Sequence, residues 1–324
     1  MIRALARSAL TRAPLYSLLR RRALARSPLT ILCYHTLSGD TGGPDAWTAL
    51  RLADFRDQIA ALRRHYRIVS LDEALDWWED GARAGPPPAV LTFDDGDRGL
   101  HQHLLPLLRE DPVPVTVYVA TSQIQSGSTY WFDRVANACG GHQRLEIDLA
   151  DAGLGRIVIG GSGEARWLMQ SALHDRLKQV DPATREALAD RIAAQAPEPA
   201  AQALGPMTLA QLQELAAHPQ VTIGAHSHCH NLLDQLPLDA ARDSIVRNVA
   251  LLQEWTGQSI AHFAYPNGNY NRSLMALVQD LGFRSATILD NGPAWPGTSL
   301  HALSRIAVGR YDTLDRIRLR LAGI

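Results

Sequence analysis

The chain has 324 residues, 46% of them apolar and 20% charged, so it is long enough for two domains or one large one and does not have a disordered composition. Its formal net charge of −1 argues against a nucleic-acid-binding surface over the whole chain, and no apolar run reaches the ~18 residues of a membrane span. Three scattered cysteines are too few for a disulfide framework or a four-cysteine zinc module, which favours a reduced, cytoplasmic setting.

The first 26 residues are strongly basic, with seven arginines and no acidic residue. The arginines interrupt the apolar stretches, whereas a secretory signal needs an uninterrupted one of about 7–15 residues. We interpret residues 1–28 as a basic N-terminal arm and residues 29–324 as one folded domain. Two interpretations of the arm stay open: a solvated tail, or weak peripheral association of residues 1–26 with the anionic inner membrane.

Short apolar runs rich in β-branched residues alternate with stretches of helical periodicity. Several runs are apolar on both faces, as the strands of a covered parallel sheet are. The repeated alternation predicts an α/β fold, either a (β/α) barrel or a doubly wound sheet. The predicted strands lie at residues 29–34, 66–71, 89–93, 115–120, 221–225, 261–265 and 284–288.

One segment, residues 131–206, breaks this rhythm. Its pattern is mostly helical, with a glycine-rich turn at 153–163 and an Ala/Pro-rich linker at 195–205. We interpret it as a helical insertion between two barrel strands that forms a cap or a wall of the cleft. A small separate helical domain is the alternative.

Two adjacent carboxylates, Asp94 and Asp95, follow the predicted strand at 89–93 and precede Gly96. Barrel enzymes keep their catalytic residues at the C-terminal ends of strands, and a turn there could bring both carboxylates to one site. A loop with an Asx turn is the structural alternative.

Three histidines, His226, His228 and His230, follow the predicted strand at 221–225. Histidines at i and i+4 share a helical face, whereas i, i+2 and i+4 share one face of a strand. Because the strand pattern ends at Ala225, we expect a helical turn with His226 and His230 as metal ligands and His228 pointing elsewhere. Two imidazoles and one carboxylate leave coordination positions for water and substrate, as at a catalytic zinc.

These motifs together resemble those of the polysaccharide deacetylases with a NodB-homology domain, carbohydrate esterase family 4. The resemblance spans residues 29–308 and includes Tyr34-His35, the Thr-Phe-Asp-Asp-Gly motif at 92–96, His-Ser-x-x-His at 226–230 and Phe-Ala-Tyr-Pro-Asn-Gly at 263–268. The last motif is most similar to the branch that acts on exopolysaccharides and surface glycans. The resemblance implies a distorted (β/α) barrel and a bacterial metal-dependent hydrolase that removes N-acetyl groups from sugars.

The resemblance also implies roles for single residues. Asp94 would be the general base, and Asp95, His226 and His230 would bind a divalent metal, Zn²⁺ by preference. Ser227 would hold the loop through a hydrogen bond.

Substrate contacts and the general acid are implied less directly. Tyr265 and Pro266 would bind the substrate, with a backbone N–H near Tyr265 for the oxyanion. The family's Leu-x-His motif is absent in clean form. His301 is its nearest match as the general acid, and His35 competes as acid or as substrate contact.

The arginine that orients the catalytic aspartate in many relatives is also missing beside Pro266. Arg305 is the candidate to replace it in space. Trp131 and Trp295 are the candidate stacking platforms for sugar rings.

The expected substrate is an N-acetylated glycan of a bacterial surface polysaccharide or its lipid-linked precursor. Because we find neither a signal peptide nor an anchor pattern, we expect it to be met in the cytoplasm, either in solution or with the protein peripheral at the inner membrane. Two other functions stay open: an inactive glycan-binding or scaffold protein, and a glycoside hydrolase using Asp94 and Asp95. The second is disfavoured because adjacent carboxylates do not easily span the ~5–9.5 Å that glycoside hydrolysis needs.

Overall fold

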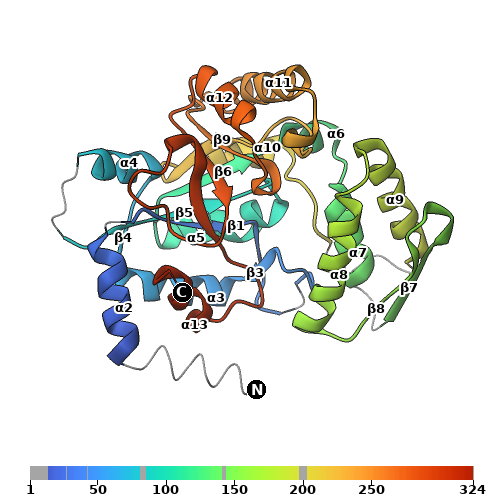
Figure 1. The fold of residues 1–324 in the computed structure, drawn as a ribbon, viewed down its shortest axis with the longest axis horizontal. Helices are drawn as coiled ribbons and strands as arrows, with labels where there is room; N and C mark the ends of the chain where they lie inside the picture. Colours follow the sequence, from blue (N-terminus) through green and yellow to red (C-terminus); the bar gives the residue numbers. More distant parts are fainter. Residues whose placement is uncertain are drawn as a thin grey trace.

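The structure is a computed structural model that describes residues 14–26, 28–41, 43–80, 85–140, 144–196 and 203–323. Its centre is a closed barrel of seven parallel strands in the order β1-β12-β11-β10-β9-β6-β5, with β5 pairing again with β1 (Figure 1). This confirms the predicted (β/α) barrel. The barrel strands are β1 (Thr30–Tyr34), β5 (Pro88–Phe93), β6 (Val115–Val119), β9 (Val221–Ala225), β10 (His262–Ala264), β11 (Ser285–Leu289) and β12 (Leu303–Ala307).

Helices cover the outside of the barrel and connect its strands. A capping box of Thr208 and Gln211 begins the helix before β9. The connecting helices are α3 (Leu52–Arg63), α4 (Leu71–Glu79), a π-helical turn (Leu100–Leu104) continued by α5 (Leu105–Glu110), α6 (Thr121–Ser126), α10 (Leu209–Ala216), α11 (Leu238–Thr256), α12 (Arg272–Asp280) and α13 (Leu314–Leu321). Short 3-10 turns lie at Leu233–Gln235, Pro266–Gly268 and Leu300–Ala302, and two short strands, β2 (Thr36–Ser38) and β3 (Ala49–Arg51), pair outside the barrel.

Six of the seven predicted strands are barrel strands, and one barrel strand was missed. The predicted run at 66–71 is reduced to the two residues of β4 (Arg67–Ile68), which pairs only with the start of β5. The missed strand is β12, whose five residues are all buried although Arg305 stands at its centre. A buried arginine in a strand is not expected from hydropathy alone.

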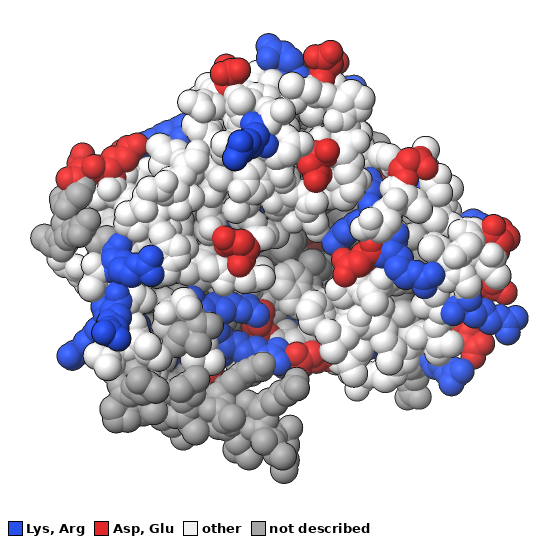
Figure 2. Space-filling view, in the orientation of Figure 1, with Lys and Arg blue, Asp and Glu red and all other residues white. Residues whose placement is uncertain are grey.

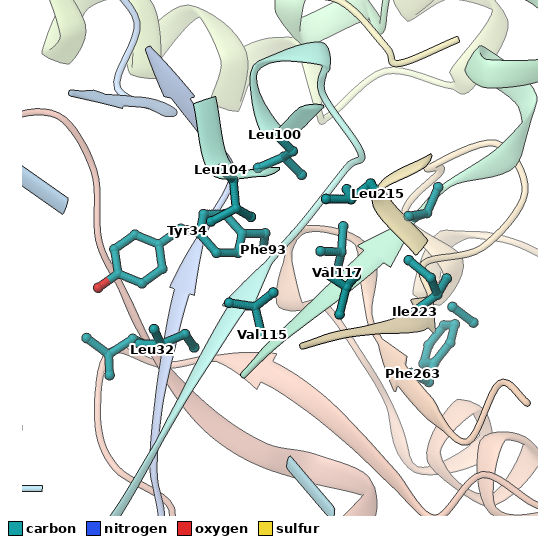
Figure 3. Close-up of a cluster of buried hydrophobic side chains, with 14 of the residues drawn as sticks. Leu32, Tyr34, Phe93, Leu100, Leu104, Val115, Val117, Leu215, Ile223 and Phe263 are labelled. Carbon is teal, nitrogen blue, oxygen red and sulfur yellow. The ribbon is translucent and has the colours of Figure 1, made fainter. Parts of the chain in front are cut away.

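The strands are apolar toward the helices and more polar toward the barrel axis. Leu32 and Tyr34 of β1, Val115 and Val117 of β6 and Ile223 of β9 belong to one buried cluster with helical leucines such as Leu104 (Figure 3). On the inside, Arg305 of β12 contacts Thr92 of β5 and lies over the ring of Tyr118 of β6. Because β12 is adjacent to neither β5 nor β6, these contacts cross the barrel interior.

The segment 131–206 lies between β6 and β9, which are adjacent in the barrel, and its described residues from 131 to 196 form the lobe at the right of Figure 1. The lobe has its own buried cluster, which includes Val135, Ile147 and Leu173. It contains α7 (Trp131–Gly140), β7 (Arg144–Leu149), β8 (Gly155–Gly160), α8 (Gly163–Leu177) and α9 (Pro182–Gln195), with a 3-10 turn at Ala150–Ala152.

The expectation that this segment is helical was incomplete, because β7 and β8 form an antiparallel hairpin. In β7 exposed and buried residues alternate strictly, as the sequence R-L-E-I-D-L would allow. The glycine-rich segment at 153–163, which we expected to be a turn, therefore also contains strand β8.

Part of the expected basic arm is folded. Helix α2 (Pro14–Ala25) packs against the C-terminal helix, with Tyr16 in a small buried cluster with Leu319 and Ala322. Residues 1–13 lie outside the described part of the chain, so the arm's first half is untested. Within the described residues, no helix combines the length and apolar character needed to cross a bilayer.

Candidate active site

The C-terminal ends of the barrel strands bring the predicted motifs together. Asp94 and Asp95 follow β5, His226 follows β9 and His35 follows β1. They line a cavity of about 250 Å³ with His230 and with residues of the insertion. In Figure 2 the surface is hollowed between the barrel and the insertion.

Asp95, His226 and His230 form a three-atom cluster. The Nε2 atoms of His226 and His230 lie 3.3 and 3.0 Å from Oδ1 of Asp95, and the three ligand atoms are within 4.8 Å of one another. Asp95 Oδ1 is buried and has no aligned hydrogen bond from any described residue. Two imidazoles and one carboxylate oxygen converging on one point fit the ligand set of a catalytic Zn²⁺.

Neighbouring groups fix the orientation of the two histidines. His226 Nδ1 donates to the carbonyl of Ala264 at 2.7 Å, which leaves Nε2 for the cluster. The backbone N–H of His230 donates to Ser227 Oγ at 3.2 Å, the loop contact expected of Ser227. His228 points away, as expected, and its Nδ1 lies 2.8 Å from Thr121 Oγ1.

The loop carrying the histidines is not the helical turn that we expected. Residues 226–230 have no helical assignment, and Ser227 and His230 have left-handed backbone angles, with φ of 63° and 53°. Asp95 is also left-handed, with φ of 73°. A non-glycine residue in this region is uncommon. These three turns, rather than helical periodicity, aim the ligands at one point.

Asp94 points into the barrel, where it forms a bidentate ion pair with Arg305. Both Nη–Oδ distances are 2.7 Å, and neither residue is more than 2% exposed. Arg305 also donates to Thr92 Oγ1 at 3.1 Å, and the Cys33 thiol donates to Asp94 Oδ2 at 3.4 Å. The structure therefore places Arg305 beside Asp94, as the sequence analysis suggested.

The charges around the site keep both aspartates ionised. Burial alone would raise the pKa of Asp94, but Arg305, and to a smaller extent His226, lower it below its usual value. Burial opposes ionisation of Asp95 too, and His230 and His226 hold its pKa well below the usual range. Two carboxylates that are adjacent in sequence thus remain anionic with different partners.

A second group, Cys33, His35 and Asp94, also has the spacing of a metal site. Arg305 donates one hydrogen bond to each oxygen of Asp94 and puts a fixed positive charge there, which repels a cation. Burial raises the pKa of the Cys33 thiol well above its ordinary value, so it stays protonated. A cation therefore fits the Asp95 cluster and not this one.

Aromatic side chains form a wall of the cavity that the sequence analysis mostly missed. Trp47 and Trp167 stack with ring centroids 6.0 Å apart, and Trp47 also lies edge-on to His35. Trp131, predicted as a stacking platform, lines the cavity as well. Trp167 and Trp131 come from the insertion, which therefore forms part of the cleft.

Several polar residues of the wall also escaped prediction. Gln170, His174 and Lys178, the only lysine of the chain, line the cavity from α8 and just beyond it. Burial lowers the pKa of His174 to about 4, so this ring is neutral. Nothing in their sequence context separates them from ordinary helix-surface residues.

Three predicted residues and one predicted tryptophan are not on the cavity wall. His301 precedes β12, and its Nε2 contacts the carbonyl of Phe283 at 2.7 Å, so the structure does not bring it to the site as a general acid. Tyr265 is fully buried, with its hydroxyl donating to the His301 carbonyl and its N–H to Thr287. Trp295 contacts Arg26 instead of the cavity.

The predicted substrate contact at Pro266 also needs correction. Pro266 is buried behind the cavity, and the next residue, Asn267, lines it instead. Asn267 is left-handed, with φ of 58°, so the turn exposes this residue in place of Pro266.

We predict that Arg305→Met strongly destabilises the protein, because the Asp94 carboxylate would stay buried without its counter-charge. Breaking a buried pair in this way costs about 3–5 kcal/mol of unfolding free energy. Arg56→Met, which removes the exposed pair with Glu110, should cost no more than about 1 kcal/mol. Urea denaturation of both variants, and of Asp94→Asn/Arg305→Met, measures this. Equal costs for the two single variants would contradict the prediction, whereas recovery in the double variant would support it.

The comparisons with known proteins agree with this geometry. A protein-family model described as polysaccharide deacetylase matches residues 81–157 and 170–286. A search of curated proteins found no match.

Three solved structures share the fold at low sequence identity. The deacetylase PplD of Streptococcus pyogenes, solved with acetate, has a TM-score of 0.60 at 15% identity over 91% of this chain and 98% of its own. IcaB from Ammonifex degensii has a TM-score of 0.57 at 18% identity, with coverage of 91% and 97%. The deacetylase domain of BpsB from Bordetella bronchiseptica has a TM-score of 0.51 at 20% identity, with coverage of 87% and 96%. With more than half of its residues matched by the family model, the chain belongs to the polysaccharide deacetylase family.

Proposed function

We propose that this protein is a metal-dependent hydrolase that removes N-acetyl groups from sugars of a bacterial surface polysaccharide or its lipid-linked precursor. The observation that carries the proposal is the convergence of Asp95, His226 and His230 beside Asp94 in one cavity. The stacked rings of Trp47 and Trp167 offer the apolar faces on which sugar rings stack.

Asp95, His226 and His230 would hold the metal, with Zn²⁺ the ion that suits this ligand set best. When bound, such a metal supplies Lewis acidity that polarises the acetamide carbonyl and eases deprotonation of the attacking water. The chain's own task is to present three deprotonated ligand atoms in fixed positions. The Ala264 carbonyl does this for His226 by holding the proton on Nδ1.

Asp94 is the proposed general base. Each carboxylate oxygen has two lone pairs. Oδ2 accepts from Arg305 and Cys33, whereas Oδ1 accepts from Arg305 alone, so Oδ1 retains a lone pair for the proton of water. The two hydrogen bonds from Arg305 fix the plane of the Asp94 carboxylate and oppose rotation of this carboxylate away from the cavity.

The same geometry opposes the two other functions. In a glycoside hydrolase two carboxyl groups face one bond as acid and base. Here Asp94 faces Arg305 and Asp95 faces the histidines, so they do not form such a pair. An inactive glycan-binding protein would not need a carboxylate poised beside a cluster of metal-ligand atoms.

Replacing single residues should separate metal binding from catalysis. We expect His226→Ala and Asp95→Asn to lose bound metal and nearly all activity. Asp94→Asn should keep the metal, but its rate should fall by about 10²–10⁴-fold, which is the contribution of acid–base catalysis. His228→Ala, a matched control two residues away from His226, should keep the metal and most of the activity because its ring faces Thr121.

The measurements are metal content by mass spectrometry and acetate release from a panel of N-acetylated oligosaccharides. No acetate release with metal restored would overturn the deacetylase proposal in favour of a binding protein. Undiminished hydrolysis after chelation would overturn the metal dependence. Full activity in Asp94→Asn would overturn the assignment of the base.

His35 is the proposed proton donor to the leaving amine. It lines the cavity within the same cluster as Asp94, and its Nδ1 is buried without a hydrogen-bond partner among described residues. We expect His35→Ala to keep the metal and to flatten the alkaline limb of the pH–rate profile, because that limb reports loss of the acid's proton. An unchanged limb would contradict this role.

We also propose that the substrate is met on the cytoplasmic face of the inner membrane. Arg22 of α2 is exposed and makes no ion pair with a described residue, and each such residue near an anionic leaflet contributes about 1 kcal/mol. The protein should co-sediment with membranes at low salt and be released at high salt. Recovery from the periplasm would contradict the location, and salt-independent behaviour would contradict the electrostatic contact.

A further inference from the structure

A second cavity, of about 350 Å³, lies between α2, α3 and α13. These three helices lie together at the lower left of Figure 1, on the outside of the barrel. The segment of the cavity wall at 64–66 leads from α3 into β4, so it lies at the N-terminal end of the strands. Asp94 and the histidines lie at the opposite end, so the second cavity is separate from the candidate active site.

The lining of this cavity is basic. Arg20, Arg21, Arg64 and Arg318 line it, and no aspartate or glutamate does. The guanidinium group of Arg318 contacts Asp315 at 3.2 Å, whereas those of the other three arginines make no hydrogen bond or ion pair with any described residue. In Figure 2 basic side chains gather over α2 with no acidic side chain among them. The cavity therefore has an excess of positive charge that the protein itself does not neutralise.

Three of the four arginines lie near one residue of the cavity wall, His65. Burial lowers the pKa of His65, and Arg20, Arg318 and Arg64 lower it further through their charges. The positive charges of Arg20 on α2, Arg318 on α13 and Arg64 just after α3 thus act on the His65 imidazole in the cavity wall. Since like charges repel, this arrangement favours a bound anion between them.

Buried polar groups of the wall also lack partners. Gln58 is only 3% exposed, and its Oε1 accepts from the Tyr34 hydroxyl at 3.0 Å, which leaves Nε2 without a partner among described residues. The hydroxyl of Tyr66, another wall residue, is buried and also unpaired within the described part of the chain. The Gln58 amide is therefore free to donate to a ligand in the cavity.

The rest of the wall is apolar. The side chains of Leu32, Leu62, Ile317 and Leu321 line the cavity beside the polar groups. A free inorganic anion would leave this surface uncovered, and a purely apolar ligand would leave the arginines and the Gln58 amide unpaired.

We propose that this cavity binds a phosphorylated amphiphile, with the phosphate at the arginines and the Gln58 amide and the apolar chain along the leucines. Guanidinium groups bind phosphate oxygens in bidentate pairs, and a phosphate monoester carries about −1.5 to −2 charges at neutral pH. A phosphate monoester therefore matches a group of several arginines better than a carboxylate does, because a carboxylate carries only one negative charge. The proposal does not depend on the deacetylase activity.

Calorimetric titration of the full chain with decyl phosphate, below its micelle concentration, tests the ligand class. Inorganic phosphate and decanol are the two comparison probes, since each carries one half of the proposed recognition. We expect decyl phosphate to bind at least about tenfold more tightly than either probe, and more weakly at high salt. Equal binding of decanol would overturn the phosphate contact, and equal binding of inorganic phosphate would overturn the apolar contact.

Variants locate the binding site. Arg20→Gln/Arg64→Gln should weaken decyl phosphate binding by at least about tenfold, because each loses a charge-assisted hydrogen bond. Arg242→Gln/Arg272→Gln removes two exposed charges that pair with no described residue and lie outside the cavity, so it should leave binding within about twofold of the parent. Equal effects of the two double variants would overturn the site.

Gln58→Glu provides a second test with little change in shape. It keeps the acceptor for Tyr34 and replaces the free donor by a negative charge, so binding should be lost while the unfolding midpoint changes little. Unchanged binding in this variant would overturn the placement of the phosphate. Because the cavity is apart from Asp94 and the histidines, acetate release should not change in any of these variants.

Discussion

The ion pair between Asp94 and Arg305 is the constraint on which the site depends. Removing two charges from water costs several kcal/mol per ion unless geometry and further hydrogen bonds compensate. Here the pair is bidentate. Arg305 also donates to Thr92 and to the Ile288 carbonyl, and Asp94 also accepts from the Cys33 thiol. Because Asp94 follows β5 and Arg305 lies on β12, the pair spans the β1 strand between them and ties the closure of the barrel to the position of the proposed base.

This constraint also explains how adjacent carboxylates take different roles. With Asp94 directed inward, the left-handed backbone of Asp95 turns the next side chain toward His226 and His230. The hydroxyl of Tyr130, a buried residue just before the insertion's first helix, donates to the Asp95 carbonyl at 2.7 Å and supports that turn. The insertion is therefore joined to the metal-ligand geometry as well as to the aromatic wall.

Sequence patterns were informative where a residue's role depends on its neighbours along the chain. Asp95, His226 and His230 stand directly after apolar strands or within a short motif, so their meeting follows from parallel strands ending at one edge. Arg305 is different, because its partner is 211 residues away and its own strand has no clear apolar pattern. Trp47 and Trp167 likewise meet only through the placement of the insertion. His301 is the opposite case. Its local sequence matches a motif and predicted a general acid, but a local match does not determine at which end or on which face of the barrel a residue lies.

The left-handed residues at the site indicate why the ligand atoms are fixed before any metal binds. Conformations of this kind cost of order 1–3 kcal/mol each and persist only where the surroundings determine them. At the histidine loop those surroundings are Asn248, which accepts from the His226 N–H, Ser227, which accepts from His230, and Ser244, which accepts from His228. Asn248 also donates to Val119 and Thr121, so β6, α6, α11 and the loop are held by one buried side chain. The strain in the ligand loop is thus balanced by hydrogen bonds that a relaxed loop would have to give up, and this keeps the two imidazoles aimed at Asp95.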